Sequence, residues 1–318
     1  MAAAAPREVI IVGAGPSGLT AAIYAARAGL KPLLFEGEPI ANNDLPGGQL
    51  MNTTEVENFP GFPNGLMGPD LIKGMRDQAV RFGTEIIARR ITKVDLMASP
   101  RRVWAGDQAY TARSIIISTG AKARMLDLPG IWDRVGHGVS TCATCDGFFF
   151  RDHDIVVVGG GDAAIEEATF LSRFARSVTV VHRRDSLRAS KVMEQRAQAD
   201  PKIKWRWNAE VTGLQGEDKL TGLQLRDTQT GATDELAATG LFIAIGHLPN
   251  SDLFKDQLAL DAAGYIVADD TRTNVPGVFA CGDVQDPHYR QAITSAGSGC
   301  MAALNAQNWL ADQAAAAV

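Results

Sequence analysis

Two glycine-rich turns constrain the fold of this chain more than any other feature of its sequence. Gly13-Ala14-Gly15-Pro16-Ser17-Gly18 follows the β-branched run 9–12, and Gly159-Gly160-Gly161-Asp162-Ala163-Ala164 follows the similar run 155–158. Each turn leads into a helical pattern, the second one over 162–174, and then into another short apolar run. A buried strand, a glycine turn, a helix and a parallel strand make the βαβ unit that binds dinucleotides. We therefore predict an α/β fold with two doubly wound dinucleotide-binding domains.

The residues of each turn have separate duties in such a unit. Gly13 permits the tight turn, Gly15 lets the backbone approach a pyrophosphate, and Gly18 lets the helix pack closely on the strand. Pro16 is tolerated in the first turn of a helix, and with Ser17 it begins the helix whose N-terminus faces the phosphates. In the second turn alanine replaces the third glycine, as the pattern allows, and the predicted cofactor residues are Gly159, Gly161, Asp162 and Ala163.

The residues that end the second strand of each unit have opposite charge. Glu36 follows the strand 33–35. At the same distance from its own turn, the second unit has His182, Arg183 and Arg184, with Arg188 close behind. An acid there hydrogen-bonds a ribose 2′-hydroxyl, whereas a basic cluster suits a 2′-phosphate, which arginine can bind in a bidentate manner. The alternative for 182–188 is a solvated basic loop. FAD at the first turn and NADPH at the second fit this contrast.

A pair of cysteines lies between the two turns, in Cys142-Ala143-Thr144-Cys145. Four cysteines in the chain are too few for a disulfide scaffold, and no second C-x-x-C or H-x-x-x-H completes a zinc site, so no metal is expected. The pair therefore indicates a redox disulfide that can store two electrons, with two buried apolar side chains as the alternative. For Cys281 and Cys300 we expect a structural role.

Composition excludes several classes of protein. The 318 residues are 46% hydrophobic and 21% charged, which is typical of a soluble globular protein and not of a disordered one. The net charge of −5 disfavours a nucleic-acid partner, which would need an excess of lysine and arginine. We see no signal peptide and no apolar run long enough for a membrane span, so a cytoplasmic location is expected.

The order of the two turns predicts a discontinuous first domain. Residues 1–121 and 248–318 would form the FAD-binding domain, and 122–247 an inserted NADPH-binding domain that carries the cysteine pair. The run 115–118 ends in Thr119 and Gly120, which would close the first nucleotide-binding half. The connections near 121–124 and 246–250 would act as the two strands of a hinge.

With these residues in place, the chain closely resembles the low-molecular-weight thioredoxin reductases of the bacterial and plant type. The block Cys142 to Gly147, reading Cys-Ala-Thr-Cys-Asp-Gly, is the most specific match. The only departures are mild ones, such as Met51-Asn52 where threonines are usual. Matching segments span nearly the whole chain in the family's order: Gly13–Gly18, Gly47–Leu50, Thr53–Gly61, Gly159–Ala164, His182–Asp185, Arg188-Ala189, Gly282-Asp283 and Arg290–Ala292.

The resemblance implies cofactors, partners and further site residues. Members of the family bind FAD and NADPH, reduce thioredoxin and work as homodimers. Asp283 would bind a ribitol hydroxyl, and Arg290, Gln291 and Ala292 would lie along the flavin and pyrophosphate. Other residues that would border FAD are Gly48, Gln49, Leu50, Asn58 and Gly282.

The resemblance also implies a mechanism. Electrons would pass from NADPH through FAD to the Cys142–Cys145 disulfide and then to thioredoxin. Cys145 would face the flavin, and Cys142 would attack the thioredoxin disulfide. Asp146 resembles the family's acid–base residue, although an Asp-Gly pair is also common as a plain turn. Because the nicotinamide and the disulfide need the same ring system, one domain would rotate against the other.

Three other functions compete with this interpretation of the sequence. Ferredoxin–NADP reductases of this architecture lack the cysteine pair that this chain has. Small-molecule dithiol oxidases keep the pair but usually lack the His-Arg-Arg cluster that is present here. A nucleotide-binding redox sensor without turnover would gain nothing from an acid beside Cys145.

Overall fold

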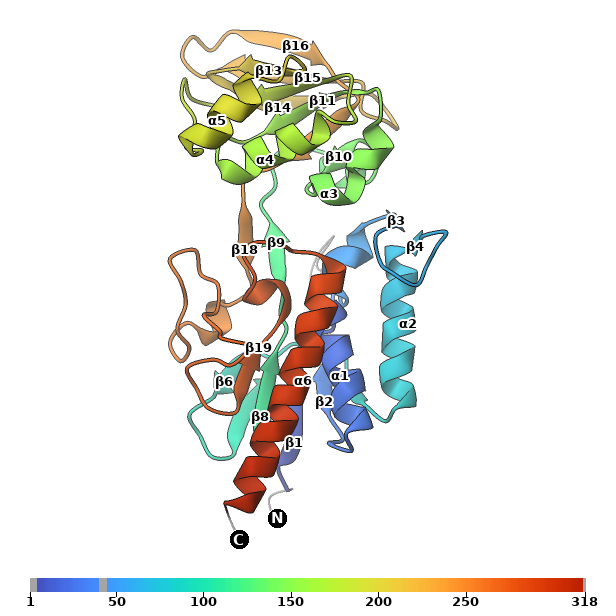
Figure 1. Ribbon diagram of the computed structural model, residues 1–318, viewed down its shortest axis with the longest axis vertical. Helices are drawn as coiled ribbons and strands as arrows, with labels where there is room; N and C mark the ends of the chain where they lie inside the picture. The colour runs from blue at the N-terminus through green and yellow to red at the C-terminus, as the bar shows by residue number, and fades with distance from the viewer. Residues whose placement is uncertain (1–4, 40–44, 317–318) are drawn as a thin grey trace. The chain divides into compact units, whose positions relative to one another are not determined.

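The computed structural model describes residues 5–39 and 45–316. The chain divides into two compact units, one made of Met1–Lys122 with Leu248–Val318 and the other of Ala123–His247. The second unit is thus inserted into the first (Figure 1). Where the chain passes between them, β9 (Ala121–Ala123) pairs with β18 (His247–Pro249). Within the described residues, no helix combines the length and apolar character that a membrane span requires.

The sheet of the first unit is built around β8 (Gln108–Ile117). One edge of β8 pairs with the parallel strand β1 (Arg7–Val12). The other edge pairs first with antiparallel β7 (Arg101–Ala105) and then with parallel β19 (Val278–Ala280). Neighbours pair with both edges of its second half, and both faces of the sheet are covered there, so residues 115–117 are fully buried. The sheet continues beyond β1 and β7 with β2 (Leu33–Phe35), β5 (Glu85–Ile87) and β6 (Lys93–Asp95).

Three helices cover one face of this sheet (Figure 1), namely α1 (Pro16–Arg27), α2 (Gly68–Arg81) and α6 (Ala292–Ala315). Successive strand residues point to opposite faces. Val9 and Ile11 therefore pack under the helices, whereas Ile10 and Val12 pack on the other face against β6, β7 and the segment 254–284. Helices α1 and α6 pack along each other. The glycine turn before α1 therefore lies close to the segment that leads into α6.

The second unit has a five-stranded parallel sheet between two layers. Two helices, α4 (Asp162–Leu171) and α5 (Lys191–Gln198), cover one face, and an antiparallel three-stranded sheet covers the other. The parallel order is β10 (Val139–Ser140), β17 (Gly240–Ile243), β11 (Asp154–Val158), β12 (Ser177–Val181) and β13 (Ile203–Arg206). The covering strands are β14 (Ala209–Gln215), β15 (Gly222–Asp227) and β16 (Thr233–Ala237).

Short elements complete both units. The short helix α3 (Ala143–Asp146) runs into the 3₁₀ turn η3 (Gly147–Phe150). The remaining pieces are η1 (Gly48–Asn52), β3 (Glu55–Val56), β4 (Leu66–Met67), η2 (Trp132–Arg134), η4 (Asp252–Phe254) and η5 (Gly282–Val284).

The helix expected over 162–174 is shorter than the sequence predicts. Helix α4 ends at Leu171, because the amides of Arg173 and Phe174 bond to carbonyls three residues back and tighten the chain into turns. The other predicted βαβ elements are confirmed to within two residues of their expected ends.

Candidate functional site

A disulfide joins Cys142 and Cys145 in the second unit. Cys142 is the N-cap residue of α3, and its Sγ accepts a hydrogen bond of 3.2 Å from the amide of Cys145. Cys145 is exposed and Cys142 is partly exposed. A disulfide at the surface can meet a protein substrate, so the buried alternative for this cysteine pair does not hold.

Asp146 is the last residue of α3 and is half-buried beside the disulfide. Burial raises the pKa of its carboxyl, and a hydrogen bond from Ser140 acts in the opposite direction. The Ser140 hydroxyl donates to Asp146 Oδ2 over 2.6 Å. A carboxyl group that protonates closer to neutral pH is suited to move a proton to and from a thiol.

The first glycine turn has the geometry that a pyrophosphate needs. Gly13 has φ +112°, and a Cβ there would lie 2.3 Å from the carbonyl oxygen of Ser118. A Cβ on Gly18 would lie 2.0 Å from the Gly13 oxygen, so helix and strand are in close contact. Gly15 is the N-cap of α1 and Pro16 its first residue, which leaves the first amides of the helix to a phosphate.

The C-terminal segment packs against this turn. A Cβ on Gly282 would lie 2.5 Å from the hydroxyl of Ser17, so the Gly-Asp motif sits on α1. Asp283 accepts a 2.7 Å bond from Ser295 of α6, and burial raises the pKa of its carboxyl. These contacts bring the predicted FAD residues of the two ends of the chain into one unit.

The other residues predicted for FAD belong to the same unit. Arg290 has φ +49° and bonds the Pro287 carbonyl, and Gln291 caps α6, of which Ala292 is the first residue. The Asn58 amide is 3.4 Å from the Gln291 side-chain oxygen. In η1, Gly48 and Gln49 are exposed, Leu50 packs into the core, and Gln49 bonds the Ala121 carbonyl at 3.4 Å.

Two residues that the sequence did not predict form hydrogen bonds with predicted FAD residues. Asn250 donates to the carbonyl of Thr119 and to that of Gly120, and its own carbonyl accepts from the Thr119 hydroxyl. Arg76 of α2 bonds the carboxylate of Glu36. Neither stands in a motif, so only contact across the fold identifies them.

The second glycine turn repeats the open approach to a helix N-terminus. Gly161 is the N-cap of α4, and a Cβ there would meet none of the described atoms within 4 Å. Ala164 fills the third-glycine position, where its Cβ lies 2.5 Å from the place of a Cβ on Gly159. Ala163 is exposed, and the Asp162 carboxylate accepts a 2.7 Å bond from the Ser190 amide.

His182 lies beneath the second turn. A Cβ on Gly160 would lie 2.2 Å from the imidazole, which is 7% exposed and packs edge-on against Trp207. Burial lowers the pKa of His182; hydrogen bonds with the backbone of Ser186 and Gly159 act in the opposite direction, and the charges of Arg184 and Arg188 lower it as well. The ring therefore supports the turn from below in its neutral form.

The three arginines of the cluster are exposed, and none forms an ion pair with any residue that the structure describes. Backbone hydrogen bonds fix the loop that carries these arginines. The Arg188 amide bonds the Gly160 carbonyl at 2.7 Å, and the carbonyls of Arg183 and Arg184 accept bonds from Thr228 and Asn208. Their guanidinium groups are thus available to an anion beside the turn.

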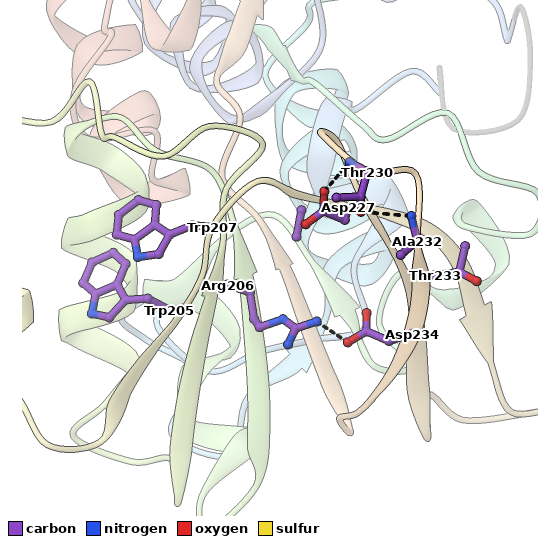
Figure 2. A pocket seen from close by; sticks show the side chains of 9 residues that line it. Trp205, Arg206, Trp207, Asp227, Thr230, Ala232, Thr233 and Asp234 are labelled. Carbon is purple, nitrogen blue, oxygen red and sulfur yellow. Dashed lines mark hydrogen bonds and ion pairs between the residues drawn. The ribbon is translucent and has the colours of Figure 1, made fainter.

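A pocket of about 460 Å³ lies where β13 meets the hairpin of β15 and β16 (Figure 2). Trp205 and Trp207 stack with ring centroids 5.0 Å apart, and Arg206 forms an ion pair with Asp234. None of its lining residues is a predicted site residue. It adjoins the basic cluster at His182, whose ring contacts Trp207 and whose backbone forms hydrogen bonds with Arg206 and Ala209.

The two remaining cysteines belong to the first unit. Cys281 is fully buried, and burial raises the pKa of its thiol to about 12, so it is unreactive at neutral pH. Cys300 is partly exposed on α6, in contact with Tyr24.

Comparisons with known proteins identify the family. The family described as pyridine nucleotide-disulphide oxidoreductase matches residues 7–299. A thioredoxin reductase of Streptomyces clavuligerus is 61% identical over 308 residues, which cover 96% of this chain and 94% of that protein. The bifunctional thioredoxin reductase/thioredoxin of Mycobacterium leprae (strain TN) is 52% identical, over 96% of this chain and 66% of that protein. The crystal structure of thioredoxin reductase from Streptococcus pyogenes MGAS5005 matches with a TM-score of 0.89 at 40% identity, covering 96% and 98% of the two chains.

The fold and the surface disulfide define a flavin-dependent disulfide reductase. The chain belongs to the pyridine nucleotide-disulphide oxidoreductases, and among them to the thioredoxin reductases. The resemblance and the α/β fold class predicted from the sequence are confirmed. The roles of single cofactor residues, and the cofactor that each unit binds, stay predictions.

Proposed function

We propose that this protein reduces the disulfide of thioredoxin with electrons from NADPH, by way of FAD and its own Cys142–Cys145 disulfide. The proposal rests on one observation above others, a surface disulfide followed directly by a half-buried carboxyl group. The proposal also includes assembly into a homodimer and a cytoplasmic location. The rotation of one unit against the other also stays a prediction.

FAD and NADPH are the cofactors of this family, and the residues of the two turns fit them. Gly15 and Gly161 each leave a helix N-terminus open to a phosphate. Glu36 suits a free ribose hydroxyl, and Arg183, Arg184 and Arg188 suit a 2′-phosphate. When bound, FAD supplies the two-electron chemistry that links NADPH to a disulfide.

The reduced cysteine pair can carry both electrons to thioredoxin by thiol–disulfide exchange. The Cys142 thiolate attacks one sulfur of the thioredoxin disulfide, which forms a mixed disulfide and releases the other thioredoxin sulfur as a thiolate. The Cys145 thiolate then attacks Cys142, which re-forms the Cys142–Cys145 disulfide and releases the second thioredoxin sulfur. Two protons complete the thioredoxin dithiol.

Asp146 is placed to handle one of those protons. Its carboxyl follows Cys145 directly, and burial keeps its pKa above that of an exposed aspartate. In its protonated form it can donate to a departing thiolate, and in its ionised form it can accept from a thiol. The plain-turn alternative gives no reason for the partly buried hydrogen bond from Ser140.

A protein substrate is favoured by the surface beside the disulfide. Phe148 and Phe149 are 57% and 43% exposed, only a few residues after Cys145. Exposed aromatic side chains beside a reactive group indicate a docking surface for another protein. The Mycobacterium leprae relative, whose name joins a thioredoxin reductase and a thioredoxin, favours thioredoxin as that partner.

The test is NADPH oxidation by the purified holoenzyme with and without thioredoxin. Rapid oxidation only with thioredoxin supports the proposal, and Cys142→Ser should abolish it while the control Cys300→Ser leaves it intact. If NADPH reduces the flavin but oxygen and not thioredoxin drives turnover, the dithiol oxidase alternative is favoured. Turnover that survives Cys142→Ser would overturn the disulfide relay.

A further inference from the structure

We propose that Ser140 is a positioning residue that fixes the carboxylate of Asp146 relative to Cys142 of the redox disulfide; this rests on the proton-transfer role proposed for Asp146. Ser140 ends β10 and is 3% exposed. Its hydroxyl lies 2.6 Å from Asp146 Oδ2. An ionised carboxylate only accepts hydrogen bonds, so the Ser140 hydroxyl is the donor in this one.

The same hydroxyl also contacts the redox cysteine. Ser140 Oγ accepts a 3.0 Å hydrogen bond from the amide of Cys142. One buried oxygen thus bridges the backbone of the first cysteine and the carboxylate that follows the second. If the Asp146 carboxylate moves relative to the backbone of Cys142, one of these two bonds must break.

The strand beneath makes this anchor rigid. Ser140 pairs with Phe242 in β17, which is a fully buried strand of the parallel sheet. A side chain with so little exposure on a paired strand has few other positions to adopt. Asp146, by contrast, lies at the end of the four-residue helix α3, where its amide bonds the Cys142 carbonyl at 3.1 Å and its side chain bonds Ser140.

The hydroxyl also sets the balance between the two forms of the carboxyl group. Burial favours the neutral acid, and the bond from Ser140 favours the anion. The helix packed against α3 is α4, which carries Asp162, Glu166 and Glu167. Those groups are acidic too, so they cannot replace the hydroxyl in stabilising the anion.

The test is the pH profile of thioredoxin reduction by the holoenzyme with Ser140→Ala. We expect kcat to fall about tenfold or more, and the limb of the profile that belongs to Asp146 to move to higher pH by roughly one unit. Reduction of the bound flavin by NADPH, followed by its absorbance, should be unchanged. Ser140→Thr keeps the hydroxyl and should retain the original limb.

Two further variants separate positioning from packing. Ser172→Ala removes another buried hydroxyl of the same unit, one that bonds the Thr169 carbonyl at 2.9 Å, and should leave the profile unchanged. In an Asp146→Asn background, Ser140→Ala should add almost nothing to the loss. An unchanged profile in Ser140→Ala, or an equal loss in the Asp146→Asn background, would overturn the inference.

Failure of the underlying function gives a different result. If thioredoxin does not accelerate NADPH oxidation by the wild-type protein, the proposed function is wrong. If Asp146→Asn retains full turnover, the proton-transfer role is wrong and the inference about Ser140 is overturned with it. If Asp146→Asn is impaired and Ser140→Ala is not, only the inference is overturned.

Discussion

Arg76 holds the carboxylate of Glu36 with two hydrogen bonds, from Nε to Oε2 at 2.8 Å and from Nη2 to Oε1 at 3.1 Å. The Glu36 side chain is 11% exposed and that of Arg76 is 42% exposed. The bond to Glu36 raises the pKa of Arg76, so its charge persists at any physiological pH. The acid predicted to bind the ribose is therefore oriented by a helix that follows it in the chain.

Replacing Arg76 should weaken FAD binding. In Arg76→Ala the carboxylate loses both donors, is free to rotate and keeps an unpaired charge at the predicted ribose site. We expect the Kd of the apoprotein for FAD to rise about tenfold, or roughly 1.4 kcal/mol. Quenching of flavin fluorescence on titration with apoprotein measures this Kd.

A matched control lies on the same helix. Lys73 pairs with Asp77 one turn away, and both side chains are largely exposed. Lys73→Ala removes a cation of α2 without touching Glu36, so its Kd for FAD should stay within twofold of wild type. Equal Kd values for the Arg76 and Lys73 variants would contradict the role of Arg76.

The basic cluster should decide between NADPH and NADH. Charge-assisted bonds to a phosphate are worth about 1.5–3 kcal/mol each, so Arg183→Ala and Arg184→Ala should each raise the KM for NADPH by roughly ten-fold or more. The KM for NADH should barely change, because NADH has no 2′-phosphate. Arg196→Ala on α5 removes an exposed cation outside the cluster and serves as the control. Parallel effects on both nucleotides would rule out a 2′-phosphate site here.

The exposed aromatic side chains should matter for a protein substrate only. Phe148 packs edge-on against Phe174, with Arg151 over its ring, and still exposes more than half of its side chain. Phe148→Ala should raise the KM for thioredoxin severalfold, on the order of 1 kcal/mol, and leave the KM for a small aromatic disulfide unchanged. Val192→Ala, at another exposed apolar residue of this unit, is the control. If both substrates are affected equally, Phe148 supports the fold and not docking.

Because of Asp154, the stability of the second unit should fall at acid pH. Its carboxylate accepts from Arg176 and from the Ser177 hydroxyl, which lowers its pKa to about 2. A lowered pKa contributes stability above the unfolded value, near 3.9, and that contribution is lost as the pH falls toward 2. Asp154→Asn should therefore lower the Tm at pH 7 by an amount worth roughly 1 kcal/mol or less, because the pair is partly exposed.

Thermal unfolding of wild type and Asp154→Asn at several pH values between 7 and 3 measures this effect. The two Tm values should differ most near neutral pH, and the difference should shrink as the pH falls from about 4 toward 2. A gap that stays constant down to pH 3 would assign the effect to lost packing instead of charge.

Much of the fold and some of the site could be predicted because the relevant signals are local. A β-branched run, a glycine turn and a helical pattern specify a βαβ unit within a few dozen residues. Glu36 and Arg183 were predicted because a strand end fixes where a ribose must lie. The spacing of Cys142 and Cys145 brought both sulfurs within reach of each other, and the disulfide confirms it.

The contacts that orient these groups could not be predicted in the same way. Arg76 and Ser140 carry no periodic or spacing signal, because each acts through one side chain that meets a residue from another element. His182 stood in the basic motif, yet the fold places its imidazole under Gly160, where burial favours the neutral ring. Asp162 began the second helix as expected, and its carboxylate holds the Ser190 amide.

The sequence by itself therefore determined two nucleotide-binding units, the contrast in charge between them and a redox-active cysteine pair. The backbone geometry of a turn or strand end depends on the residues that adjoin it, so these features can be predicted from short stretches of the sequence. Only the tertiary structure decided which side chains hold Glu36 and Asp146, and how Gly282 comes to rest on Ser17. Those relationships join distant parts of the chain, and they exist only once packing has fixed the direction of each side chain.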